Sequence, residues 1–80
     1  MQVWTHIREL SLGTVGTIVG YEKAYGGYIG KLIALGLTPG TQFIFLDSNT
    51  QKDSVVMLLS DKVVELSKPE TNALCVEETK

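Results

Sequence analysis

The sequence predicts a mainly β domain: a small, partly open β-barrel of five to six short strands, with one inserted short α-helix and a short helical turn before the last strand. All eight glycines lie between positions 13 and 40, so turns are expected in the first half. After Thr41 the apolar residues alternate with a period of two, which indicates strands. With 80 residues, the chain is expected to form one domain over 1–80.

The first half is expected to contain two short strands. Residues 3–7 form the first, followed by turns near Leu10 and Gly13. Residues 14–21 are rich in β-branched side chains and form the second, which Gly16 and Gly20 weaken or bend.

Residues 26–35 carry apolar side chains at spacings of three and four, which predicts a short amphipathic helix. Its apolar face is expected to bury Ile29, Leu32 and Ile33. The end of this helix is well defined, because Gly36 suits the left-handed C′ position. Leu37 beyond it can pack back onto Leu32, as in a Schellman motif.

A type II turn is expected next, because Pro39 and Gly40 occupy its two central positions. Strands follow over residues 41–46, 54–59, 62–66 and 73–77, with the polar run 47–53 as a loop and Ser60-Asp61 as a tight turn. Pro69 suits the first turn of a short helix over 69–72. The pattern predicts a core that includes Leu32, Leu37, Phe43, Phe45, Val55, Met57, Leu59, Val64, Leu66, Leu74 and Val76.

The charge balance argues against a nucleic-acid binder. Seven Lys and Arg face nine Asp and Glu, a net charge of −2, whereas such proteins normally carry a basic face. No apolar run approaches the roughly 20 residues of a membrane span. Residues 1–10 contain charges, unlike a signal peptide, and a single cysteine fits a reducing compartment. We therefore expect a cytoplasmic domain.

No motif for nucleotide binding is complete. Gly26 lies one position too close to Gly30-Lys31 for a Walker A loop, and Leu32 follows where a hydroxyl is needed. Residues 27–30 match the GxxG pattern of KH domains, but the chain lacks the basic surface that such a loop serves.

The sequence also offers little for metal binding or covalent catalysis. His6 and Cys75 are its only His and Cys, too few for a zinc site. His6 is expected to be a half-exposed structural residue, and Cys75 to pack within a strand. We expect no catalytic residues, no metal site and no cofactor.

Residues 31–41 resemble the signature of the FeoA family, small accessory proteins of bacterial ferrous iron uptake. The signature has a basic residue and Leu, then Leu-Gly-hydrophobic, then Pro-Gly-Thr or Ser; the matching residues here include Leu32, Gly36, Leu37, Pro39 and Gly40. Individually weaker matches extend the resemblance from about residue 4 to residue 77: Ile7, Leu10, Gly13, Gly16, Ile18, Val55, Met57, Leu59, Leu66, Leu74 and Val76. Ser67 and Thr71 depart from the family pattern, which usually has Arg and often Ala there.

The resemblance implies an SH3-like barrel that is cytosolic and not enzymatic. Its partner would be FeoB, the membrane ferrous iron transporter with a cytosolic GTPase domain. Two alternatives stay open: a nucleic-acid- or ribosome-binding SH3-like barrel of the KOW type, and a stand-alone relative of the SH3-like domain in metal-dependent repressors. Assembly into a homo-oligomer is a further alternative that stays open.

The partner is expected to dock on the predicted helix and the loop before it, through Tyr25, Tyr28, Lys31 and the exposed edge of Leu35. The competing interpretation is that the tyrosines only cap the mouth of the barrel. If Lys31 is a free surface cation, Lys31→Glu should change the stability by no more than about 0.5 kcal/mol. The outward strand positions Ile44, Val56 and Leu58 are the next candidates for a contact surface.

Overall fold

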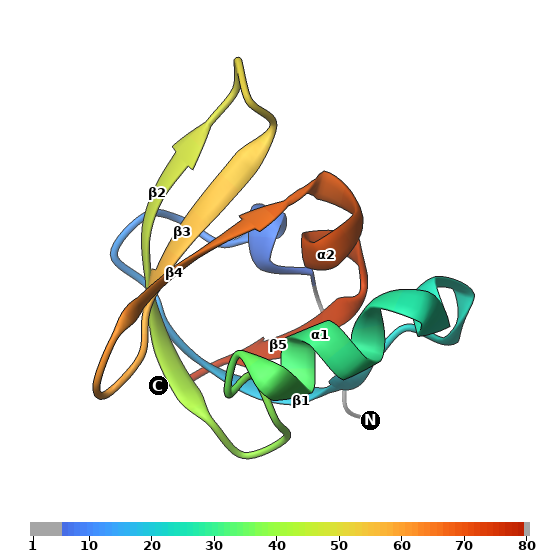
Figure 1. Ribbon diagram of the computed structural model, residues 1–80. Helices are drawn as coiled ribbons and strands as arrows, with labels where there is room; N and C mark the ends of the chain where they lie inside the picture. Colours follow the sequence, from blue (N-terminus) through green and yellow to red (C-terminus); the bar gives the residue numbers. More distant parts are fainter. Residues whose placement is uncertain (1–5, 80) are drawn as a thin grey trace.

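The computed structural model describes residues 6–79. Five strands, two short α-helices and two 3-10 helices (η) follow one another along the chain (Figure 1). In order they are η1 (Ile7–Glu9), β1 (Val15–Tyr21), η2 (Lys23–Tyr28), α1 (Ile29–Ala34), β2 (Gln42–Asn49), β3 (Ser54–Leu58), β4 (Val63–Ser67), α2 (Lys68–Asn72) and β5 (Leu74–Glu78).

All strand pairs are antiparallel, and the strand order in the sheet is β4-β3-β2-β1-β5. The sheet curves around the core without closing, and α2 joins its two edge strands, β4 and β5 (Figure 1). Register shifts between Ile18 and Gly20 and between Phe45 and Asp47 mark irregularities that bend the strands. The predicted partly open barrel with an inserted helix is confirmed.

The core lies on the concave side of this sheet. Phe43 and Phe45 of β2 are buried, as the alternation predicts, and so are Leu32 of α1 and Leu37 after it. The other residues of this cluster are Ile7, Ile18, Val55, Met57, Leu59, Val64, Leu66, Ala73, Leu74 and Val76. Every core residue predicted from the strand pattern is therefore buried.

Gly16 of β1 lies opposite Phe43 of β2, where no side chain fits. A Cβ atom at position 16 would lie 2.6 Å from Cζ of the Phe43 ring and 3.1 Å from the backbone oxygen of Glu77. The glycine therefore makes room for one of the two phenylalanine rings of the core.

The end of α1 has the predicted Schellman geometry. The Leu37 N–H donates to the Leu32 carbonyl at 2.9 Å, the Gly36 N–H donates to the Ile33 carbonyl at 3.0 Å, and Gly36 has a φ of 89°. The Tyr21 hydroxyl of β1 donates to the Leu37 carbonyl at 2.7 Å, which ties the helix end to the sheet. Burial raises the pKa of this hydroxyl, so it stays a donor at neutral pH.

The type II turn is also confirmed. The Thr41 N–H donates to the Thr38 carbonyl at 3.0 Å, and Gly40 has the positive φ, 94°, that its position requires.

The N-terminal strand expected over residues 3–7 is not found where the structure can test it. Residues 3–5 lie outside the described residues, and Ile7 begins the 3-10 turn η1 instead of ending a strand. The Leu10 N–H donates to the Ile7 carbonyl at 3.0 Å, and this local bond replaces pairing with a neighbouring strand. Ile7 still contributes to the core.

The helix expected over residues 26–35 is two helices. η2 ends at Tyr28 and α1 begins at Ile29, and Tyr25 has the non-helical angles φ −113° and ψ 34°. Glycines at 26, 27 and 30 disfavour a regular helix, which explains the short α-helical part. Ile33 is 50% exposed, because a helix of this length presents one narrow stripe to the sheet and Leu32 occupies it.

The loop expected over residues 47–53 is shorter than predicted, because β2 continues to Asn49 and pairs there with β3. The Asn49 side chain accepts hydrogen bonds from the N–H groups of Gln51 and Lys52, and Asp53 has a φ of 54°. Polar residues thus form the end of a hairpin instead of an open loop.

Candidate partner-binding surface

The four residues expected to dock the partner lie on η2, α1 and the residue after α1. Tyr25 and Leu35 are half-buried and pack against the core. They therefore hold the segment in place and offer little area to a partner. Tyr28, directly before α1, is 38% exposed. The structure therefore leaves one of the two tyrosines available for contact.

Sequence reasoning missed a further exposed apolar residue on the same helix, Ile33, because its spacing in the chain suggested burial. Around Tyr28 and Ile33 the backbone is open: a Cβ atom added at Gly26, Gly27 or Gly30 would meet nothing within 4 Å. An exposed aromatic and an exposed aliphatic side chain beside uncovered backbone form a surface that a partner could approach closely.

Lys31 of α1 pairs with Glu70 of α2. The Lys31 side chain is 62% exposed, whereas that of Glu70 is 5% exposed. Lys31 is therefore exposed, as expected, but it is paired with an acid of the same chain. The pair fastens α1 to α2, and reversing the charge at position 31 would place a second carboxylate beside the buried Glu70.

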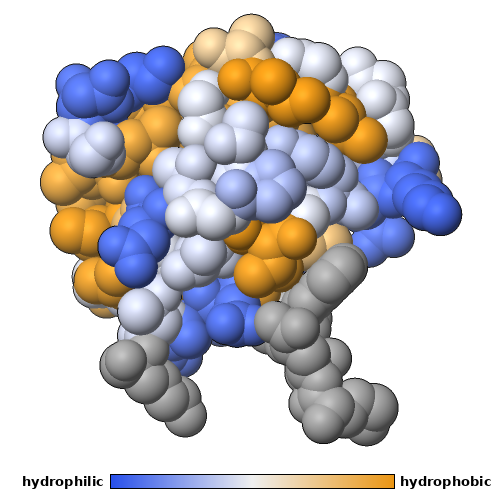
Figure 2. Space-filling model, turned by 90° about the horizontal axis from the view of Figure 1, so that it is seen from below, coloured by the Kyte–Doolittle hydropathy of each residue, from blue (hydrophilic) through white to orange (hydrophobic). Residues whose placement is uncertain are grey.

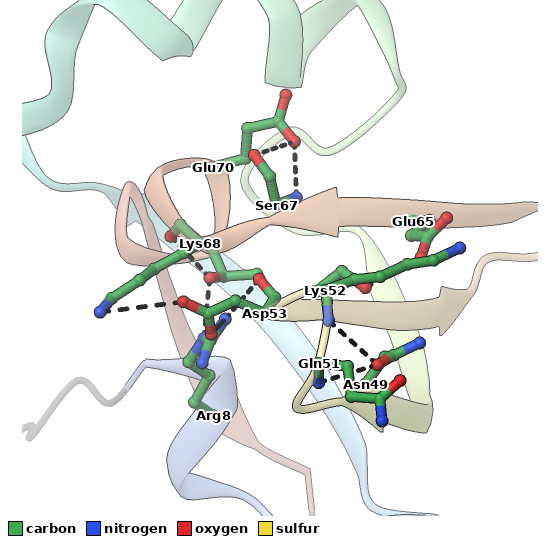
Figure 3. A network of polar contacts seen from close by, with 11 residues as sticks. Arg8, Asn49, Gln51, Lys52, Asp53, Glu65, Ser67, Lys68 and Glu70 are labelled. Carbon is green, nitrogen blue, oxygen red and sulfur yellow. Dashed lines mark hydrogen bonds and ion pairs between the residues drawn. The ribbon is translucent and has the colours of Figure 1, made fainter.

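Glu70 is held by hydrogen bonds on its other side. Its Oε1 accepts from the backbone N–H of Ser67 at 2.7 Å and from the Ser67 hydroxyl at 2.9 Å (Figure 3). Burial alone would raise the pKa of the Glu70 carboxyl. The hydrogen bond from Lys31 and those from Ser67 outweigh burial and hold the pKa below its ordinary value of 4.5. Ser67-x-x-Glu70 has the spacing of a capping box, the signal that could have identified this role from the sequence.

A second polar cluster fixes α2 to the β2–β3 hairpin and to η1. Nη2 of Arg8 lies 2.6 Å from Oδ1 of Asp53 and donates to the Asp53 carbonyl at 2.8 Å (Figure 3). Nε of Arg8 donates to the buried Thr71 hydroxyl at 3.2 Å, and Nζ of Lys68 lies 3.8 Å from Oδ2 of Asp53. Thr71, a departure from the family pattern, is thus a hydrogen-bonding residue here.

Two further reactive side chains, Cys75 and His6, both lie near Glu22. Cys75 is buried in β5, as predicted; burial, followed by the nearby Glu22 carboxylate, raises the pKa of its thiol, so the nucleophilic thiolate is disfavoured. His6 is half-buried before η1, with its nitrogens 4.0 Å from Glu9 and from Glu22. Among residues 6–79, no three His, Cys, Asp or Glu side chains lie close enough to hold a metal ion.

None of the helices within residues 6–79 has both the length and the apolar content that a membrane span requires.

Solved structures of the same fold fall into two groups. One group is formed by small proteins of similar length. An iron uptake regulatory protein (FeoA) matches 98% of this chain and 100% of its own, with 19% identity and a TM-score of 0.79. An FeoA-like protein from Clostridium acetobutylicum matches 98% and 90%, with 18% identity and a TM-score of 0.84.

The other group consists of longer proteins. A manganese-dependent transcriptional repressor in complex with manganese has a TM-score of 0.89 at 15% identity, and T. acidophilum IdeR has 0.80 at 20%. The chain spans only 38% and 36% of those two proteins. At these identities the likeness concerns the fold.

Family membership is decided by the sequence. No curated protein matches the chain significantly, but the model of the FeoA domain matches residues 5–78, nearly its whole length. The chain therefore belongs to the FeoA domain family, which is associated with ferrous iron transport.

Proposed function

We propose that this protein is a non-enzymatic, cytoplasmic accessory module of ferrous iron uptake that binds an FeoB-type transporter at its cytosolic GTPase domain. The observation that carries this proposal is the match of the FeoA domain to residues 5–78. The buried thiol and the absence of a metal-binding cluster within residues 6–79 agree with a module that works by contact.

The docking surface in this proposal is the segment η2–α1. Tyr28 and Ile33 make the contact, while Tyr25 and Leu35 hold the segment against the core. Lys31 keeps α1 in place through Glu70. An aromatic residue and an aliphatic residue on a rigid support are typical of the few side chains that dominate an interface.

The distribution of cations favours this proposal over nucleic-acid binding. Arg8 and Lys68 pair with Asp53, and Lys31 pairs with Glu70. Three of the seven Lys and Arg residues are therefore paired with two acids of the same chain, Asp53 and Glu70, which reduces the positive charge that could contact phosphates.

The test is a calorimetric titration of the purified GTPase domain of the transporter with the wild-type protein and with the double variant Tyr28→Ala/Ile33→Ser. We expect the variant to bind roughly tenfold or more weakly, because both changes remove exposed anchors without opening a core cavity. Leu12→Ser is the matched control: Leu12 is 58% exposed but lies between η1 and β1.

Two results would contradict the proposal. Wild-type affinity in the folded double variant would place the docking surface elsewhere. Absence of binding to the GTPase domain, with RNA or DNA binding that falls steeply with salt, would favour the nucleic-acid alternative. GTP hydrolysis followed in the same samples shows whether binding changes the activity of the partner.

A further inference from the structure

The charges of the five strands all have the same sign. Their charged residues are Asp47, Glu65, Glu77 and Glu78, and none of the five strands contains Lys or Arg. Every cation of the chain lies in a helix, a turn, a loop or a terminus. The sheet is therefore an acidic element within a protein whose net charge is only −2.

An apolar row crosses the convex face of this sheet. The strand registers pair Val15 with Ile44, Ile44 with Leu58, and Leu58 with Val63, so one aliphatic residue from each of four neighbouring strands lies in line. Val15 is 40% exposed and Val63 57% exposed, and the two between them are half-buried. In Figure 2, hydrophobic surface gathers at the left margin, the side on which β2, β3 and β4 lie in Figure 1.

A groove runs along part of this row. The pairing of β2 with β3 ends at Ile44 and Leu58, whereas Gln42 and Phe43 continue to pair with β1 alone. The space where β2 and β3 separate has a volume of about 340 Å³ and is lined by Val15, Gln42, Phe43, Ile44, Leu58, Leu59 and Ser60. Side chains of a partner could therefore enter the surface beside the row.

Acidic residues flank the row on both sides. Asp47 and Glu65 both pair with Val56. Val56 is the neighbour of Leu58 on the same face of β3, two residues before it in the chain. Glu77 pairs with Thr17, which is the next residue after Val15 on the same face of β1. Two cations lie near the ends of this region: Lys52 in the β2–β3 turn extends toward Glu65 (Figure 3), and Lys62 directly precedes Val63, with its side chain near Gly36.

We propose that the convex face of the sheet is a second docking surface, for a protein segment that presents aliphatic side chains flanked by lysine or arginine. The apolar row, Val15, Ile44, Leu58 and Val63, would contact the aliphatic residues, and the exposed Asp47 and Glu65 beside it would pair with the cations. A second copy of this chain fits poorly, because two such faces would bring like charges together around the contact. This surface lies on the side of the sheet opposite the core to which α1 contributes Leu32.

The test uses NMR titration of the full chain with a short peptide of four aliphatic residues that carries two lysines at each end. The matched control is the same peptide with glutamates in place of the lysines. We expect saturable shifts at the amides of the apolar row with the lysine peptide, weakening as salt is added. The glutamate peptide should bind at least roughly tenfold more weakly.

A variant separates this face from the surface on α1. Val63→Ser should weaken binding of the lysine peptide while the melting temperature stays unchanged, and Ile33→Ser should leave binding as in the wild type. Equal affinity for both peptides, or shifts confined to η2 and α1, would overturn the proposal. Concentration-dependent shifts of the row without peptide would also overturn it, because they would identify a second copy as the occupant. None of these outcomes depends on the transporter.

Discussion

Two groups of glycines in the first half of the chain differ in what the fold requires of them. Gly36 and Gly40 have positive φ angles, and Gly16 lies against the Phe43 ring, so each has a structural reason. The glycines at 26, 27 and 30 have neither a positive φ nor a neighbour within 4 Å of an added Cβ atom. The fold requires glycine at the positions of the first group, whereas it does not require glycine at 26, 27 or 30.

The comparison separates two kinds of information in the sequence. The residues around the end of α1 determine how the chain turns from helix to strand, and they would be needed in any protein with this backbone. The glycines of η2 and α1 make that segment less stable than alanines would. Their effect is to leave backbone uncovered beside Tyr28 and Ile33, which agrees with a role in contact.

Gly16→Ala should have the largest effect on the fold-determining group. The new methyl group would overlap the Phe43 ring and approach the Glu77 backbone, so a core side chain has to leave its position. We expect a loss of about 2 kcal/mol in the free energy of unfolding, measured by urea denaturation. A variant as stable as the wild type would show that the Phe43 ring can move without penalty.

Gly36→Val should follow, with a loss of more than about 1 kcal/mol, because a β-branched residue is strained at a φ of 89°. The space around position 36 is sufficient, since the nearest atoms to an added Cβ lie at 3.8 Å. The loss would therefore arise from the backbone alone. Gly36→Asn is the matched control and should be less destabilising, because asparagine tolerates the left-handed region better; an unchanged melting temperature for Gly36→Val would contradict the Schellman cap.

Removing the contact between α1 and α2 should have an intermediate effect on the stability. Lys31→Met should lower the stability by about 1 kcal/mol at neutral pH, because Glu70 loses its charged partner and the exposed lysine is partly screened by water.

The same pair predicts how the stability depends on pH. The pKa of Glu70 is lower in the folded than in the unfolded protein, so its stabilising contribution is present above the ordinary glutamate pKa of 4.5 and is lost as the pH falls through the folded value. Urea denaturation across this range should show the wild-type and Lys31→Met curves converging in acid. Glu70→Gln should weaken this acid dependence, and an offset between wild type and Lys31→Met that persists at low pH would argue against the pair as its source.

The smallest effects are expected for Gly26→Ala, Gly27→Ala and Gly30→Ala. Each substitution restricts the unfolded chain at an open, non-strained position, so the stability should stay the same or rise by about 0.5 kcal/mol. Thermal unfolding of the single variants measures this directly. A lowered melting temperature in any of them would mean that the glycine has a structural role.

Sequence reasoning succeeded where one local rule dominated. The Schellman end of α1, the type II turn and the alternation of β2 to β5 each follow from residue type and spacing, and the structure confirms them. It was wrong about Ile7 and Ile33, whose surroundings depend on packing over long distances and on a helix too short to bury two stripes.

The candidate surfaces were less predictable than the fold. Lys31 and Glu70 are 39 positions apart in the chain. Because β2, β3 and β4 separate α1 from α2 in the sequence, no local pattern reveals that the two helices are in contact. The apolar row on the convex face depends on the strand register, although Ile44 and Leu58 were expected to point outward from alternation alone. That Val15 and Val63 lie in line with Ile44 and Leu58 follows only from the strand order and register.

The most direct test of the contrast between the two groups of glycines is one variant measured in two ways. The triple variant Gly26→Ala/Gly27→Ala/Gly30→Ala is compared with the wild type in melting temperature and in calorimetric affinity for the GTPase domain of the transporter. We predict a melting temperature equal to or above that of the wild type together with weaker binding, because the methyl groups cover backbone that the partner approaches. A lower melting temperature, or unchanged affinity in a folded variant, would contradict the assignment of this segment to a partner.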